Sequence, residues 1–293
     1  ATTEIYTLSL HDALPISLIN SFQPQTPKID YLDKISKIQQ YIVAGDCYQV
    51  NLAQHFSAPY NGNIFTAYLA LREKMPSPYA AFWSWEKSKG VMSLSPERFL
   101  QVRDGYAETK PIKGTMSRSS DNKQDQQNAQ LLLSSEKDLA ENLMIVDLLR
   151  NDLSKNAEKG SVLVPKLFAL ESFTNVHHLV STVTAKLKLG VSPSKLLRDC
   201  FPGGSITGAP KQRAMQVIEE LEPIKRNVYC GSIGYINADA TMDTNIAIRT
   251  VLADGQNLHC WGGGGITADS DPTTEYQESL SKIITLLKII ENL

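Results

Sequence analysis

"YAAFWSWEKSKGVMSLSPERFLQVRDGYAETKPI", residues 79–112, is the stretch that decides the fold class of this chain. Short runs of apolar and β-branched residues alternate in it with polar turns, and Asp104-Gly105 is a dipeptide typical of tight hairpins. This pattern predicts an antiparallel meander. Residues 228–265 repeat the pattern, with Asp254-Gly255 at one turn, and predict a second meander.

Helical patterns lie between and after the two meanders. We expect helices at 28–45, 131–153, 211–222 and 272–292, a polar loop at 117–130 and further strands near 161–189. Two groups of strands with helices between them indicate an α+β fold. We therefore predict two antiparallel β-sheets packed as a sandwich, with the helices outside.

No linker or repeat divides the chain, so residues 21–293 are expected to form a single catalytic domain. The first 20 residues, "ATTEIYTLSLHDALPISLIN", lack a basic segment followed by a continuous apolar core and make a poor signal peptide. We expect residues 1–20 to be a non-native leader that lies outside the fold.

Composition excludes several classes of partner. The chain has 293 residues with 29 Lys and Arg against 31 Asp and Glu, so there is no basic excess that would indicate nucleic acid. No apolar run is long enough to cross a bilayer, and we expect no membrane partner. The cysteines are far apart and form no C-x-x-C pair, which favours reduced thiols and a cytoplasmic location.

Two pairs of carboxylates stand at helical spacing. Asp138 and Glu141 share one face of the helix expected at 131–153, and Glu275 and Glu278 share a face of the last helix with Lys282. Spacing alone favours a structural interpretation, in which these groups suit the helix dipole or form a solvated face with a Glu278–Lys282 pair. If the two pairs meet, they would make an oxygen-rich site for Mg²⁺.

Other residues could bind an anion or act in catalysis. The stretches "FPGGSITGAPK" and "CWGGGGIT" could bring backbone N–H groups close to a carboxylate or phosphate, although neither is specific alone. Arg249 lies in an apolar segment expected to be a strand, so its guanidinium should meet a carboxylate of the protein or of a substrate. For His178 a structural role is the default, and Lys113, between Pro111 and Gly114, is by local pattern a solvated loop lysine.

In combination, these motifs resemble the chorismate-utilising enzymes, which include anthranilate, aminodeoxychorismate, isochorismate and salicylate synthases. The resemblance runs from about Ile38 to the C-terminus and implies the family's sandwich of two sheets with the site between them. Relatives carry a longer N-terminal segment, and we expect most of it to be missing here. The motifs that carry the resemblance include "GDCYQVNLAQ", "LSPERF", "KPIKGT", "DLAENLMIVDLLRNDL", "NVHHLVS", "FPGGSITGAPKQRAM", "NIAIRTVL" and "GGGGITADSDPTTEYQESLSK".

Two positions distinguish the branches of this family. Gln49 stands where the members that add water to chorismate have a lysine base, which argues against isochorismate or salicylate synthesis. Lys113 in "PIKGT" is typical of the aminodeoxychorismate synthase component I branch. Anthranilate synthases usually have "PIAGT" at the same place. The resemblance makes Lys113 the nucleophile and Glu97 the general acid for the hydroxyl that leaves.

The resemblance also assigns the remaining site residues. It implies a Mg²⁺ cofactor bound by Glu141 and Glu278, with Asp138 and Glu275 bonding its waters. Substrate-binding roles fall to Arg249 and Tyr235 for the enolpyruvyl carboxylate and to Lys282, Gly264 and Gly265 for the ring carboxylate. His178 is placed near C4, and Ser205, Thr207, Thr115 and Gln49 complete the substrate-binding set.

The reaction implied is conversion of chorismate and ammonia to 4-amino-4-deoxychorismate through a covalent lysine intermediate, for p-aminobenzoate and folate synthesis. A glutamine amidotransferase subunit would supply the ammonia. Anthranilate synthase component I and a truncated, inactive chorismate-binding domain remain the alternatives.

Overall fold

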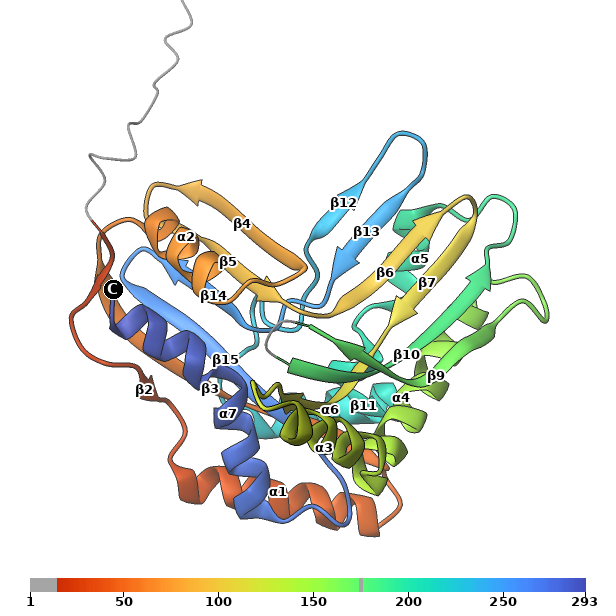
Figure 1. The fold of residues 1–293 in the computed structure, drawn as a ribbon, viewed down its shortest axis with the longest axis horizontal. Helices are drawn as coiled ribbons and strands as arrows, with labels where there is room; N and C mark the ends of the chain where they lie inside the picture. Colours follow the sequence, from red (N-terminus) through yellow and green to blue (C-terminus); the bar gives the residue numbers. More distant parts are fainter. Residues whose placement is uncertain (1–14, 174–175) are drawn as a thin grey trace, which may run out of the picture.

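The computed structural model describes residues 15–173 and 176–293, and it contains two antiparallel sheets (Figure 1). The first sheet has the order β1-β3-β15-β14-β5-β4, with β2 and β11 also paired to β3. Its strands are β1 (Ser17–Leu18), β2 (Gln23–Pro24), β3 (Gln49–Asn61), β4 (Tyr79–Glu86), β5 (Lys89–Ser95), β11 (Gly208–Ala209), β14 (Thr250–Asp254) and β15 (Asn257–Ile266).

The second sheet has the order β12-β13-β6-β7-β10-β8, with β9 paired to β10. Its strands are β6 (Arg98–Arg103), β7 (Tyr106–Lys110), β8 (Ile112–Ser117), β9 (Leu163–Ser172), β10 (Val176–Lys186), β12 (Gly234–Ile236) and β13 (Met242–Asn245). The α+β class and the two antiparallel sheets predicted from the sequence are confirmed.

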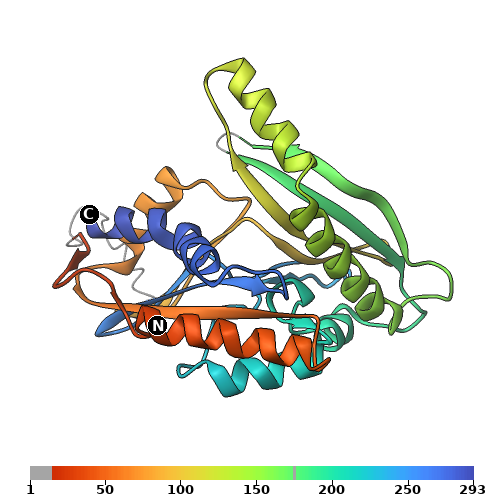
Figure 2. The same ribbon diagram turned by 90° about the horizontal axis from the view of Figure 1, so that it is seen from below.

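Helices cover the sheets and close the core. They are α1 (Lys28–Val43), α2 (Ile64–Lys74), α3 (Asn122–Leu133), α4 (Glu136–Ser154), α5 (Pro193–Cys200), α6 (Lys211–Leu221) and α7 (Pro272–Glu291). Helices α1 and α6 pack against β3, while α3 and α4 pack against the second sheet (Figure 2). None of the helices in the described part of the chain is long and apolar enough to cross a membrane.

Each meander passes through both sheets, so neither sheet is built from one meander alone. The chain leaves β5 of the first sheet and enters β6 of the second through Pro96 and Glu97, and it returns from β13 to β14 through residues 246–249. The two crossings lie side by side, because Ile246 N–H donates to the Glu97 carbonyl (3.0 Å) and Leu94 N–H donates to the Arg249 carbonyl (3.0 Å). The segment 243–253, expected as one strand, is therefore two strands in different sheets.

The predicted helix boundaries were wrong in the middle of the chain. Residues 122–133, predicted mostly as loop, form helix α3, which is capped by the Asp121 side chain accepting from Gln124 N–H (2.8 Å). The helix expected at 131–153 is interrupted, and α4 starts after Ser135, whose hydroxyl accepts from Asp138 N–H. The two serines at 134–135 favour a cap over a continuous helix.

Two apolar helix residues are exposed, and part of the expected leader is structured. Ile29 in α1 and Leu143 in α4 are both exposed. At the N-terminus, Ile16 is buried and Ser17–Leu18 pair with β3, so the expectation that the first 20 residues lie outside the fold is wrong for this segment. Residues 1–14 lie outside the described residues, and the non-native origin of the leader stays a prediction.

The glycine-rich loop at 201–210 is tied to the helices behind it by Lys211. The Lys211 ammonium pairs with the buried Asp152 of α4 and donates to the carbonyls of Cys200 (2.8 Å) and Pro202 (2.7 Å). Asp152 also pairs with Lys155 at 3.0 Å, but the Lys155 side chain is half exposed. The enclosed Lys211 should therefore contribute more to the free energy of unfolding than the exposed Lys155.

We predict that Lys211→Met lowers the free energy of unfolding by about 3 kcal/mol, because it leaves a buried carboxylate and two carbonyls without their shared donor. Lys155→Met removes the same charge from the same carboxylate and should cost below about 1 kcal/mol. Urea unfolding of the two variants measures the difference, and equal losses would contradict this role for Lys211.

Candidate functional site

Glu97 lies at the crossing from the first sheet to the second and is buried. Burial raises the pKa of Glu97 to about 7. The hydrogen bond of Ser205 and the positive charges of Lys113 and Lys282 lower it, but by less than burial raises it. Such a carboxyl holds a proton near neutral pH and can give it to a leaving group. The structure thus brings together four residues that the sequence analysis proposed from different motifs.

Lys113 projects from β8 toward helix α4. Its ammonium lies 3.6 Å from Glu141 Oε2, and both side chains are mostly enclosed, at 13% and 12% exposure. The prediction from local pattern that Lys113 is a solvated loop lysine is therefore wrong. Gly114 has φ +80, and a Cβ there would lie 3.0 Å from the Asp138 carboxyl carbon, so only glycine fits between Lys113 and the start of α4.

Three carboxylates of two helices converge on one residue that the sequence analysis missed. The Lys137 ammonium lies 2.9 Å from Glu275 Oε1, 3.6 Å from Glu278 Oε2 and 3.9 Å from Glu141 Oε1. Helices α4 and α7 therefore meet at Lys137, which contacts Glu141 of α4 and Glu275 and Glu278 of α7. The signal for Lys137 was its position one turn before Glu141 in the same helix.

Glu275 is the most enclosed member of this group, with 1% exposure. Its Oε1 accepts from the Ser270 hydroxyl (2.8 Å), whereas Oε2 is buried without a hydrogen-bond partner. The expectation of a solvated charged face on α7 is therefore wrong for Glu275. It holds for Glu278, which is partly exposed and pairs with Lys282 at 2.8 Å.

The donor set fits a hard cation. Glu141, Glu275 and Glu278 offer carboxylate oxygens, the ligands that Mg²⁺ prefers, and the unpartnered Glu275 Oε2 is an acceptor that a cation would satisfy. As they stand, no three Asp, Glu, His or Cys side chains in residues 15–173 and 176–293 are close enough to hold a metal, and Lys137 lies among the oxygens. Asp138 packs against Gly114 instead. Metal binding by these residues stays a prediction.

The strand β15 forms one wall of the site through its glycines. A Cβ on Gly264 would lie 3.4 Å from Glu275 Oε2 and 3.5 Å from the Lys282 ammonium, and Lys282 also donates to the Gly263 carbonyl (3.0 Å). The Gln49 side chain covers Gly265, because a Cβ there would lie 2.0 Å from Gln49 Nε2. The glycines thus leave backbone within reach of the charged groups.

His178 and Thr115 form a polar pair on neighbouring strands. The Thr115 hydroxyl and His178 Nδ1 are 2.8 Å apart, across the β8–β10 pairing. Burial, together with the positive charge of Arg249, lowers the pKa of His178 to about 4. His178 is therefore a neutral imidazole at physiological pH.

Arg249 lies at the second crossing between the sheets and not within a strand, with a left-handed φ of 50°. Burial lowers its pKa, and no carboxylate among the described residues lies within ion-pair distance of its guanidinium. An enclosed guanidinium without an acidic partner is suited to bind a carboxylate from outside the chain. Of the two alternatives left open for Arg249, this favours a substrate carboxylate.

Two residues expected to contact the substrate, Tyr235 and Thr207, are placed differently from the charged residues described above. Tyr235 lies on the edge strand β12 with 58% of its surface exposed, and no described hydrogen bond joins it to Arg249. The Thr207 hydroxyl donates to the Gly203 carbonyl (2.9 Å), so it stabilises its own loop. Direct substrate contacts by these two residues stay predictions.

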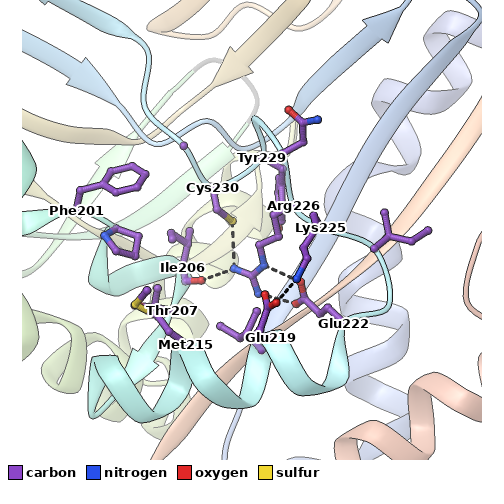
Figure 3. Close-up of a pocket in the computed structure, with 15 residues that line it drawn as sticks. Phe201, Ile206, Thr207, Met215, Glu219, Glu222, Lys225, Arg226, Tyr229 and Cys230 are labelled. Carbon is purple, nitrogen blue, oxygen red and sulfur yellow. Dashed lines mark hydrogen bonds and ion pairs between the residues drawn. The ribbon is translucent and has the colours of Figure 1, made fainter.

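A separate pocket of about 270 Å³ lies beside the loop at 201–210 (Figure 3). Its main charged pair is Arg226 and Glu222, 2.6 Å apart, and Arg226 also donates to the carbonyls of Ile206 (2.8 Å) and Asn51 (2.7 Å). These bonds tie the loop to β3. The pocket holds none of the lysines and carboxylates gathered around Glu97 and Lys137, so we do not take it as the reaction site.

Comparison with known proteins identifies the family of this chain. Residues 9–288 match the family model of the chorismate binding enzymes. The chain belongs to this family. Members similar to it include aminodeoxychorismate synthase component 1 of Salmonella typhimurium, 49% identical over 95% of this chain and 61% of the relative, and that of Klebsiella aerogenes, 50% identical over 96% and 62%. The chain thus spans about 60% of the length of these relatives.

A solved member of the family has the same fold. Anthranilate synthase component I from Streptococcus pneumoniae superposes with a TM-score of 0.84 and 36% identity, covering 94% of this chain and 60% of that one. A Bacillus anthracis protein described as a putative 2,3-dihydroxybenzoate-specific isochorismate synthase, at 23% identity and a TM-score of 0.82, shares the fold.

The raised pKa of Glu97 gives a pH prediction. Between about pH 4.5 and 7 the folded chain keeps a proton on Glu97 that the unfolded chain has lost, so this group makes wild-type stability fall as pH rises through that window. Glu97→Gln removes the effect. The free energy of unfolding of this variant relative to wild type should rise by about 2–3 kcal/mol from pH 5 to pH 8. Urea unfolding at both pH values measures it, and a constant difference would contradict the assignment.

Proposed function

We propose that this chain carries the catalytic site of an aminodeoxychorismate synthase component I, which converts chorismate and ammonia to 4-amino-4-deoxychorismate. The observation that carries the proposal is the enclosed Lys113 amine in the same site as Glu97, whose pKa of about 7 suits a proton donor. The relatives of about 50% identity bear the name of this enzyme.

The first displacement forms a bond to the enzyme. In the structure Lys113 is an ammonium beside Glu141, so it must first lose one proton to solvent. The resulting amine attacks C2 of chorismate, the ring double bonds shift, and the C4–oxygen bond breaks. Glu97 gives its proton to the departing hydroxyl, which leaves as water. Glu97 then carries the negative charge, and Lys113 and Lys282 offset it.

The second displacement releases the enzyme. Ammonia attacks C4, the double bonds shift back, and the bond between C2 and the Lys113 nitrogen breaks. Two displacements place the new amine on the face that the hydroxyl occupied. Glu97 as a carboxylate accepts a proton from the incoming nitrogen and becomes an acid again. Lys113 is released as a neutral amine and regains its ammonium proton from solvent.

The charged groups around the site would orient chorismate. Arg249 is proposed to bind the enolpyruvyl carboxylate, and Lys282 with the backbone of Gly264 and Gly265 to face the ring carboxylate. Mg²⁺, held by Glu141 and Glu278 with Glu275 nearby, would neutralise the ring carboxylate when bound. His178, neutral and fixed by Thr115, could donate a hydrogen bond near C4.

Ammonia would come from a glutamine amidotransferase subunit, since the curated relatives are named component 1 of their enzyme. The product would lead to p-aminobenzoate and folate. We place the reaction in the cytoplasm, because the four cysteines are all free and buried, as a reducing compartment favours.

Anthranilate synthesis is the second candidate. The anthranilate synthase component 1 of Bacillus subtilis is 43% identical over 90% of this chain and 51% of the relative. That reaction needs ammonia at C2, the carbon that Lys113 would occupy in our mechanism. An inactive chorismate-binding domain is the further alternative, because the chain spans about 60% of its relatives.

Incubation of the chain with chorismate, Mg²⁺ and ammonium separates these functions. We expect 4-amino-4-deoxychorismate, detected as p-aminobenzoate after a lyase is added. Anthranilate fluorescence without lyase would show the second candidate to be correct. A chain that unfolds cooperatively yet gives neither product nor chorismate binding would indicate the inactive domain.

The nucleophile is tested by mass spectrometry of the intact protein. With ammonia withheld, we expect wild type to gain the mass of chorismate less one water, because the second displacement cannot occur. Lys113→Ala should gain no mass and lose nearly all activity with ammonium. Lys110→Ala, which removes a nearby lysine paired with Glu171 on the same sheet, should keep the adduct. Wild-type rates in Lys113→Ala would contradict the mechanism.

A further inference from the structure

The ammonium of Lys137 lies where the proposed reaction would require a metal ion. It contacts Glu275, Glu278 and Glu141 from two helices, at 2.9, 3.6 and 3.9 Å. We propose that Lys137 is a tethered cation that occupies the metal position when no divalent ion is bound, and that a divalent ion must displace it. The inference rests on the Mg²⁺ site of the proposed function and adds a competitor for that site.

The electrostatics of the cluster require a cation at this position. Carboxylates that share a site disfavour each other's ionised form unless a positive charge lies close to them. The Lys113 ammonium lies 3.6 Å from Glu141, and the Lys282 ammonium lies 2.8 Å from Glu278. In residues 15–173 and 176–293, Lys137 is the one cation within ion-pair distance of the buried Glu275.

The same cluster keeps one acceptor unused. Glu275 Oε2 is buried and has no hydrogen-bond partner, although Lys137 contacts the other oxygen of this carboxylate. Oε2 points to the backbone of β15 beside Glu278 Oε1, since a Cβ on Gly264 would lie 3.4 and 3.7 Å from these two oxygens. A lysine therefore satisfies the cluster incompletely, and a divalent ion could bind both oxygens.

Lysine and metal cannot occupy the cluster together. Mg²⁺ needs oxygens at about 2.0–2.1 Å, whereas the ammonium holds them 2.9 to 3.9 Å away from its nitrogen. Lys137 can leave, because its side chain is 47% exposed and lies in the first turn of α4. Lys113 is more enclosed, at 13%, and Lys282 is also bonded to the Gly263 carbonyl.

The consequence is that metal affinity is lowered by the cost of displacing Lys137. Removal of the lysine should tighten divalent binding by about fivefold, the upper end of what one partly exposed ion pair contributes. Arginine should weaken it below wild type, because a guanidinium binds carboxylates at two points and is harder to displace.

The test measures metal binding without chorismate. Mg²⁺ is titrated by calorimetry and Mn²⁺ by electron paramagnetic resonance into wild type, Lys137→Met, Lys137→Arg and Lys123→Met. Lys123 is exposed on α3, so its variant removes one positive charge away from the cluster and should bind within about twofold of wild type. We expect the affinity order Lys137→Met, then wild type, then Lys137→Arg.

Equal affinities of wild type and Lys137→Met would overturn the inference and leave the metal site intact. If neither protein binds Mn²⁺, both the inference and the metal proposal fail. Should Lys137→Met fold only with Mg²⁺ present, that dependence supports the inference. If Lys137→Met does not fold at all, the comparison of Lys137→Arg with wild type decides. Divalent-ion affinity of Lys137→Arg equal to or tighter than that of wild type would overturn the proposal.

Discussion

The structure depends on the hydrogen bonds that hold the two crossings between the sheets together. Ile246 N–H to the Glu97 carbonyl and Leu94 N–H to the Arg249 carbonyl keep both chain segments in register where they leave one sheet for the other. Regular pairing stops there, so Glu97 and Arg249 are enclosed by both sheets without being part of either. The left-handed backbone of Arg249 belongs to this change of direction. A buried acid and a partly buried guanidinium thus follow from the topology itself.

Charge is the second constraint, because the site encloses more acidic and basic groups than a protein interior normally tolerates. Glu141 of α4 and Glu275 and Glu278 of α7 each have a lysine within ion-pair distance, and Lys137 bridges the two helices. Glu97 is the exception. Burial raises the pKa of Glu97 to about 7, opposed only by the Ser205 hydrogen bond and the charges of Lys113 and Lys282, so it holds a proton near neutral pH. This separation between a neutral acid and paired carboxylates is what acid catalysis needs.

Much of this could be predicted from the sequence, for identifiable reasons. Strands and the last helix carry strong local signals, namely the Asp-Gly turns and the Asp271-Pro272 start, and the motifs brought Lys113, Glu97 and the carboxylates of α4 and α7 into one site. Sheet membership could not be predicted, because a strand pattern such as 243–253 does not show where the chain changes sheets. Helix α3 was missed because a glutamine-rich segment has no apolar face. Lys137 was missed because its contacts to Glu275 and Glu278 are made across 138 residues or more of sequence.

The most direct test of the account is a crystal structure of this chain with Mg²⁺ and a stable chorismate analogue. We predict the analogue at the crossing of the sheets, with its C2 carbon against the Lys113 amine, its C4 substituent facing the Glu97 carboxyl, and Lys137 moved away from Glu275. An analogue bound in the pocket beside Arg226, or one that turns its C2 carbon away from Lys113, would contradict it.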